Sequence, residues 1–172
     1  DDVNKLKNYL IKNGFSEIIN FPFTANEEKK SISIDNPLDS NRRNLRTSLK
    51  NSLLDNLLYN ERRQKDSIKL FEISDIYTKN DQINQEKKLG IIISGRQGHN
   101  YLDFSKKLDH DYLNNILNQD SDNSIFTIEE ISRTELKTKK KDRIFYIEIP
   151  IDKIPKYLLK DSESSLNQIN FI

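Results

Sequence analysis

Three arginines and a lysine stand immediately before and at the start of a run of leucines with helical spacing. They are Arg42, Arg43, Arg46 and Lys50. A guanidinium group holds phosphate or carboxylate through two parallel hydrogen bonds, so this cluster could bind a nucleotide or an acidic partner. Cations at the start of a helix oppose its dipole unless an acidic group compensates them. The pattern therefore favours a paired role for Arg46, whose partner could be a protein chain or a ligand.

The two histidines are the other candidates for metal binding or proton transfer. His110 lies between Asp109 and Asp111, whereas His99 lies in a polar segment. A histidine flanked by carboxylates could be a metal ligand or a general base. Because no further ligand residues converge on either histidine in the sequence, exposed or capping roles are favoured. We expect no metal site.

Other charged motifs are less specific. The basic run KTKKKDR at residues 137–143 has no interleaved aromatic ring for base stacking, which favours a solvated hairpin tip over an RNA contact. Glu129 and Glu130 are adjacent on a predicted strand and point to opposite faces, so they cannot act as an acid/base pair. The sequence contains no GxGxxG, GxxxxGK[ST], HExxH or GxSxG motif.

The elements that must position these residues begin with an amphipathic pattern. Apolar residues at helical spacing predict a helix over residues 3–13, which Gly14 ends in a left-handed cap. Residues 15–23 are rich in β-branched and aromatic side chains and predict a strand, with Pro22 marking its end or a sheet edge. The alternation in SISI, residues 31–34, predicts a second short strand.

Leucines from Leu45 to Leu58, three and four residues apart, predict one long helix that ends near Arg63. Residues 68–77 alternate and predict a strand, and residues 89–95 predict another. The polar segment between these two strands predicts a hairpin connection and therefore antiparallel pairing.

Further along, residues 109–117 predict a short helix and residues 151–159 a second one. Strands are predicted at 124–131 and 143–151, and a polar tail follows Asp161. Because the strands neighbour one another rather than alternate with helices, the predicted fold class is α+β.

The composition limits the function classes. A chain of 172 residues suits one domain with its own core. Its 28 basic and 27 acidic residues give a net charge of +1, so RNA contacts would have to be local. The sequence has no cysteine for disulfides or thiolate metal sites, no apolar run long enough to span a membrane, and no leader pattern, so we expect a cytoplasmic protein.

Four segments, taken in order, resemble the beta subunit of bacterial-type phenylalanyl-tRNA synthetase. They are LIKNGFSEIINFPF, IDNPLDSNRRNLRTSLKNSLLDNLLYN, KLFEISDIY and LGIIISG, and they run from about Leu10 to Gly95. The resemblance implies a class II aminoacyl-tRNA synthetase-like antiparallel sheet flanked by helices over residues 1–160. Residues 161–172 are then a polar tail or a linker to a following domain. The pattern fades after about Asp103.

The resemblance also bears on catalysis. In catalytic class II domains the strand matching LFEISDIY ends in an arginine followed by an acidic residue, which together hold ATP. Here Thr78 and Asn80 take those positions and only Lys79 is basic. A threonine cannot supply the forked donors that a phosphate needs, and no glycine occurs between Asn100 and Ile172 for a glycine-rich third motif. The resemblance therefore implies a non-catalytic core without a cofactor, while the whole enzyme uses ATP and magnesium.

For partners, the resemblance implies the catalytic alpha subunit, a second alpha-beta pair, and tRNA(Phe) bound by the whole enzyme. Class II cores commonly associate through the first helix and the strand after it. We therefore expect subunit contacts at Leu6, Leu10, Phe15, Phe21, Phe23, Arg46 and Leu49, and anion contacts at Arg42, Arg43 and Lys79.

Two alternatives remain. An active adenylate-forming site would use Arg46, Arg62 or Arg63, and Lys79 as phosphate ligands, and would bind ATP with micromolar affinity. An RNA-binding module would use residues 137–143, and its affinity for tRNA would fall steeply with salt because each phosphate contact releases counterions.

Overall fold

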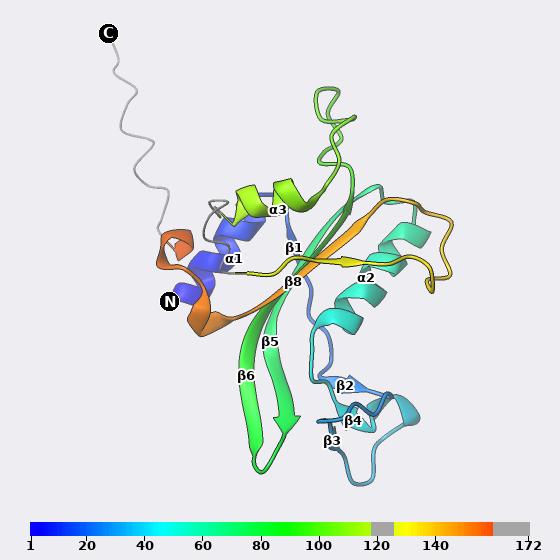
Figure 1. Cartoon of the computed structure of the whole chain (residues 1–172), viewed down its shortest axis with the longest axis vertical. Helices are drawn as coiled ribbons and strands as arrows, with labels where there is room; N and C mark the ends of the chain where they lie inside the picture. The colour runs from blue at the N-terminus through cyan, green and yellow to red at the C-terminus, as the bar shows by residue number, and fades with distance from the viewer. Residues whose placement is uncertain (118–125, 160–172) are drawn as a thin grey trace.

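The computed structural model describes residues 1–117 and 126–159, which are built around a five-stranded sheet (Figure 1). The strand order is β1-β5-β6-β8-β7. β1 runs parallel to β5, and the other neighbouring strands are antiparallel. The strands are β1 (Ser16–Glu17), β5 (Ser67–Lys79), β6 (Ile83–Gly95), β7 (Glu129–Ile131) and β8 (Ile144–Pro150).

Helices cover both faces of this sheet. Alternate residues of a strand point to opposite faces, so Phe71 packs with one helical layer and Leu70 with the other. Gly90 lets the second layer approach closely, because a Cβ there would lie 2.8 Å from a methyl carbon of Leu53. The predicted α+β class, an antiparallel sheet flanked by helices, is confirmed. The first layer holds α1 (Asp2–Lys12) and α3 (His110–Ile116), and the second holds α2 (Lys50–Arg62).

A small second sheet leads into α2. Its strands pair antiparallel in the order β2-β4-β3. The strand predicted over residues 15–23 is thus two short strands in different sheets, with Pro22 between them. The carbonyl of Pro22 accepts a hydrogen bond from the Arg46 amide at 2.9 Å, which ties the two segments together. The elements are β2 (Phe23–Thr24), β3 (Ile32–Ser33), the 3₁₀ turn η1 (Ser40–Arg42) and β4 (Asn44–Leu45).

Two predicted boundaries are wrong. α2 begins at Lys50 rather than Leu45, because Leu45 belongs to β4 and pairs with Phe23 and Ile32. The hairpin connection is much shorter than predicted, because β5 and β6 continue as a two-stranded ribbon to Lys79 and Ile83. Residues 84–87 are polar because they are exposed on this ribbon, so their polar character does not mark a loop.

The ends of the described chain follow the predicted pattern with local differences. Gly14 has a φ of 83°, as a left-handed helix end requires. The last predicted helix is two 3₁₀ turns, η2 (Ile151–Lys153) and η3 (Lys156–Leu159), separated at Pro155, which has no N–H to donate. Part of the predicted strand at 124–131 and the predicted tail at 161–172 lie outside the described residues. Within residues 1–117 and 126–159, no helix is long and apolar enough to cross a membrane.

Candidate functional site

A buried ion pair anchors the C-terminal end of α2. Arg133, which follows β7, donates from Nη2 to Glu61 Oε1 at 2.5 Å and from Nη1 to Oε2 at 3.1 Å. The two side chains are 15% and 4% exposed. Arg133 also donates to Ser94 Oγ at 3.2 Å and to the carbonyl of Asp142. A surface connection is therefore bound to both α2 and the central sheet.

Sequence reasoning missed this pair. Glu61 lies four residues after Leu57, which lies four residues after Leu53, so Glu61 continues the buried row of α2. A carboxylate in a buried row requires a cation or hydrogen-bond donors. That signal was present in the sequence, although it does not identify Arg133 as the partner.

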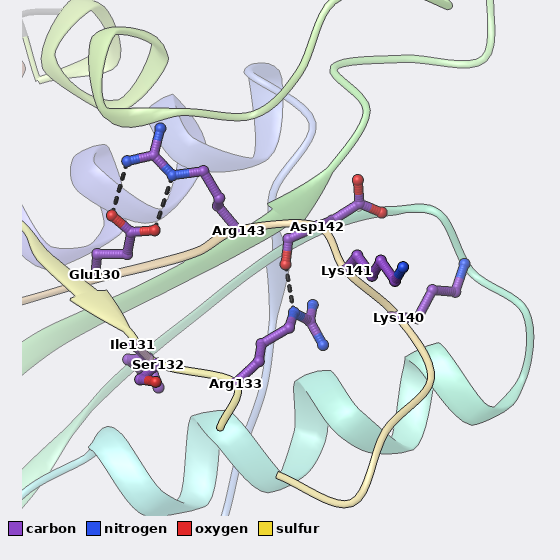
Figure 2. Close-up of a pocket in the computed structure, with 8 residues that line it drawn as sticks. All are labelled: Glu130, Ile131, Ser132, Arg133, Lys140, Lys141, Asp142 and Arg143. Carbon is purple, nitrogen blue, oxygen red and sulfur yellow. Dashed lines mark hydrogen bonds and ion pairs between the residues drawn. The ribbon is translucent and has the colours of Figure 1, made fainter. Parts of the chain in front are cut away.

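Two pockets lie on either side of the basic run. One, of about 520 Å³, lies between β7 and the segment that leads into β8 (Figure 2). Its carboxylate Glu130 is held by Arg143 through bonds of 2.8 and 2.7 Å, which lower the pKa of Glu130 and raise that of Arg143. The other pocket, of about 370 Å³, is lined by Leu58, Glu61, Arg62, Lys137, Thr138, Lys139 and Lys140.

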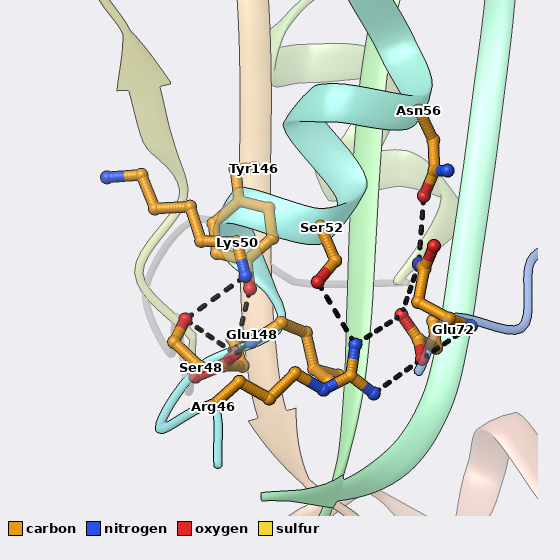
Figure 3. A network of polar contacts seen from close by, with 10 residues as sticks. Arg46, Ser48, Lys50, Ser52, Asn56, Glu72, Tyr146 and Glu148 are labelled. Atoms are coloured by element: carbon orange, nitrogen blue, oxygen red, sulfur yellow. Dashed lines mark hydrogen bonds and ion pairs between the residues drawn. The ribbon is translucent and has the colours of Figure 1, made fainter. Parts of the chain in front are cut away.

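A second buried pair lies near the other end of α2, where Arg46 faces Glu72 of β5 (Figure 3). Nη2 of Arg46 donates to Oε1 of Glu72 at 2.6 Å, and Nη1 donates to Oε2 at 3.2 Å. Their side chains are 5% and 1% exposed. The prediction that Arg46 is paired is confirmed, and its partner is a carboxylate of the same chain.

Neighbouring amides and hydroxyls complete this centre. Asn20 Nδ2 donates to Glu72 Oε2 at 2.9 Å, and Arg46 Nη1 donates to Ser52 Oγ at 3.2 Å. The Nε of Arg46 is buried and has no partner among the described residues. Beside it lies a pocket of about 330 Å³ whose lining includes the carboxylates of Glu28 and Asp55. Two carboxylates make this pocket a poor site for a triphosphate.

Glu148 of β8 caps the start of α2. Its Oε1 accepts hydrogen bonds from the Leu49 amide at 2.7 Å and from Ser48 Oγ at 3.1 Å, while Leu49 itself provides no side-chain cap. A negative charge here complements the helix dipole and compensates the nearby cations. Burial, followed by the charge of Glu148, raises the pKa of Tyr146, whose hydroxyl donates to Glu148 at 2.8 Å. Lys50 pairs with Glu129.

The predicted anion ligands stand apart from this centre. Arg42 pairs with Asp39 at 3.4 Å and lies over the ring of Phe21, 5.2 Å from its centroid. Arg43 is exposed, and Lys79 is exposed near the tip of the β5–β6 ribbon. Their role as anion contacts stays a prediction.

The residues predicted for subunit contacts differ widely in exposure, and most of them are buried within this chain. Four of the apolar ones are 0–3% exposed and belong to this chain's own core: Leu6, Leu10, Phe15 and Leu49. Arg46 is 4% exposed, Phe23 is half-buried, and Phe21 is 71% exposed. Subunit contact through these residues stays a prediction, and Phe21 is the member of the set with a largely open side chain.

Neither histidine gathers metal ligands. His99 Nδ1 lies 3.8 Å from a carboxylate oxygen of Asp66, and His110 Nδ1 lies 2.9 Å from the amide nitrogen of Asn114. Within residues 1–117 and 126–159, no group of three or more His, Cys, Asp or Glu side chains could hold a metal ion.

The fold is that of the class II aminoacyl-tRNA synthetases. A pyrrolysyl-tRNA synthetase of Desulfitobacterium hafniense superposes with a TM-score of 0.59 at 13% identity, over 91% of this chain and 67% of that chain. The profile described as phenylalanyl tRNA synthetase beta chain CLM domain matches residues 2–138. This chain therefore belongs to that family, as the resemblance indicated.

Relatives with curated names agree with the family assignment. The phenylalanine-tRNA ligase beta subunit of Mycoplasma capricolum is 38% identical over 86 residues, which are 45% of this chain and 11% of the relative. That of Carboxydothermus hydrogenoformans is 34% identical over 128 residues, which are 66% of this chain and 16% of the relative. This chain thus matches 11–16% of the length of these two relatives.

Proposed function

We propose that this chain is the synthetase-like core of the beta subunit of a cytoplasmic phenylalanine-tRNA ligase, and that it acts as a scaffold for the catalytic alpha subunit. The whole enzyme, with a second alpha-beta pair, would use ATP and magnesium to aminoacylate tRNA(Phe). The observation that carries this proposal is the closed Arg46–Glu72 pair, which neutralises the buried arginine of the 42–46 cluster within this chain and so keeps it from a substrate.

The absence of catalysis in this segment is supported by its charge arrangement. Adenylation needs cations already directed at the charge that develops on the phosphate. Here Arg46 is neutralised by Glu72, and its neighbouring pocket holds Glu28 and Asp55. Thr78 pairs across the ribbon with Asn84, where a catalytic domain of this class would hold an arginine. We therefore infer that this segment does not carry out the reaction itself.

Docking on the alpha subunit is supported by apolar side chains that this chain leaves open. Ile19, Phe21 and Leu38 are 87%, 71% and 86% exposed; the first two precede β2 and the third lies in the connection between β3 and β4. Removing such side chains from water drives association. An obligate partner would bury more than roughly 2,000 Å² in total, of which these residues would form one part.

Sedimentation velocity of this chain mixed with alpha subunit tests the docking. We expect a complex that is weakened at least tenfold by Ile19→Ser with Phe21→Ser. The matched control is Tyr101→Ser, because Tyr101 is 94% exposed but belongs to a different loop. Failure to form any complex contradicts the scaffold role.

Isothermal titration with ATP and magnesium tests the absence of an adenylate site. We expect no binding by this chain alone. Micromolar binding that Lys79→Ala abolishes would favour the adenylate-forming alternative. Lys79 is the better probe than Arg46, since it is exposed and its replacement leaves the buried pair intact.

A further inference from the structure

The two segments joined by the Arg133–Glu61 pair carry more cations than their acidic residues neutralise. Glu61 is paired with Arg133, Glu130 with Arg143 and Asp142 with Lys107, and Glu135 is the further acidic residue of the 130–143 segment, with no ion pair among the described residues. Seven other cations of these segments make no ion pair within the described residues. They are Arg62, Arg63, Lys65, Lys137, Lys139, Lys140 and Lys141, and together they are called the basic face.

The fold gathers five residues of the basic face along two adjoining pockets. Arg62, from the last turn of α2, lines the pocket of about 370 Å³ together with Lys137 and Lys139. Lys140 lines both this pocket and the one of about 520 Å³, which Lys141 also lines. Arg62 and Lys137, some 75 positions apart in the sequence, therefore line the same pocket, and Lys140 connects it to the second pocket.

The loop that carries the lysines is held in place without a ligand. Arg133 binds its base to Glu61, and Thr138 Oγ1 donates to the same carboxylate at 3.2 Å. The Lys140 amide in turn donates to Thr138 Oγ1 at 3.2 Å. Because the backbone under the lysines is already ordered, a ligand loses less binding free energy to loop ordering.

The chemistry of the basic face favours a polyanion over a folded protein. Protein interfaces have an apolar core, whereas the hydrophobic residues that line these two pockets are Leu58 and Ile131, and Ile131 is buried in this chain's own core. Arg63 follows Arg62 in the sequence, is exposed, and lies over the Tyr59 ring, 4.2 Å from its centroid. We propose that the basic face binds the phosphate backbone of RNA. The choice of RNA among polyanions rests on the proposed function.

Fluorescence anisotropy with labelled tRNA, recorded between 50 and 200 mM salt, tests this proposal. The test variant combines Lys137→Gln, Lys139→Gln, Lys140→Gln and Lys141→Gln in this chain. We expect affinity to fall at least tenfold, and the slope of log K against log salt to shrink by about 3, since each phosphate contact contributes roughly 0.7–0.9. Replacing the same four lysines with arginine should retain most of the affinity.

The matched control removes the same charge elsewhere, through Lys5→Gln, Lys12→Gln, Lys29→Gln and Lys87→Gln, all at exposed positions. It should change affinity less than twofold. Equal losses in both variants, a flat salt dependence, or equally tight binding of polyglutamate would overturn the proposal. Sedimentation with alpha subunit separates the two hypotheses, because the test variant should still form the complex if the basic face serves RNA alone.

Discussion

An Arg–Glu ion pair lies near each end of α2, and the two pairs differ in how far they are buried. Near its start, Arg46 and Glu72 are 5% and 1% exposed and join the small sheet to the central one. At its end, Arg133 and Glu61 are 15% and 4% exposed and hold a surface connection. The first pair is enclosed by the fold, whereas the second fixes a loop whose lysines remain open. An Arg–Glu pair can therefore be fully enclosed in one region of the fold and hold an exposed basic loop in place in another.

Breaking the enclosed pair should have the largest effect. Arg46→Ala leaves Glu72 buried without its cation, so we expect the free energy of unfolding to fall by about 3–5 kcal/mol. Urea denaturation followed by circular dichroism measures it. The control is Arg46→Met combined with Glu72→Leu, which removes both charges and should cost less than the single change. A loss under about 1 kcal/mol in the single variant would contradict the structural role of the pair.

Breaking the pair at the other end should cost less. Arg133→Gln leaves Glu61 with the Thr138 hydroxyl and partial access to water, so we expect a loss of about 2 kcal/mol by urea denaturation. It should also loosen the 132–143 connection, which faster amide exchange at Lys140 would report. A double-mutant cycle with Glu61→Gln should show strong coupling, and additive losses would mean that the two side chains act independently.

The sequence predicts the central packing well because periodic apolar rows are local signals. The Leu53–Leu57 row and the alternation around Phe71 correctly indicated α2 and β5. The start of α2 could not be predicted in this way, because Leu45 fits the helical spacing and its pairing with Phe23 and Ile32 places it in β4. Strand pairing is a long-range property that periodicity does not record.

At the candidate site, too, the sequence revealed the local features but not the long-range contacts. The sequence indicated that Arg46 needs an acidic partner, since the helix dipole is a local effect. It did not identify Glu72, and it missed Arg133 with Glu61, because those partners are 26 and 72 residues apart. The basic run was visible in the sequence, but its connection to Arg62 required the folded arrangement.

A smaller effect is expected at Asp55, on the α2 surface between the two pairs. Asp55 is exposed, but partial desolvation of its carboxyl by the surrounding chain raises its pKa, and the opposing influence of Arg62 is smaller. The folded state therefore binds its proton more tightly than the unfolded state, whose pKa is near 3.8. Stability should fall as pH rises from that value through the raised one.

Asp55→Asn tests this pH dependence. It should raise the melting temperature slightly at pH 7 and leave it unchanged near pH 3, where the carboxyl is protonated in both states. Glu27→Gln is the control, since Glu27 is exposed and has no resolved ion pair within the described residues. A stabilisation that is equal at both pH values would show that charge burial is not its cause.

The exposed pair Arg143–Glu130 should show the smallest effect, although its hydrogen bonds are as short as those of the buried pairs. Its side chains are 65% and 45% exposed, and water screens exposed charges and competes for their donors. Arg143→Gln should leave the melting temperature unchanged within error. The same variant should raise the lowered pKa of Glu130 toward its ordinary value, which carboxyl NMR titration measures. A melting temperature that falls as far as it does for Arg133→Gln would mean that bond geometry, rather than burial, decides what these pairs contribute.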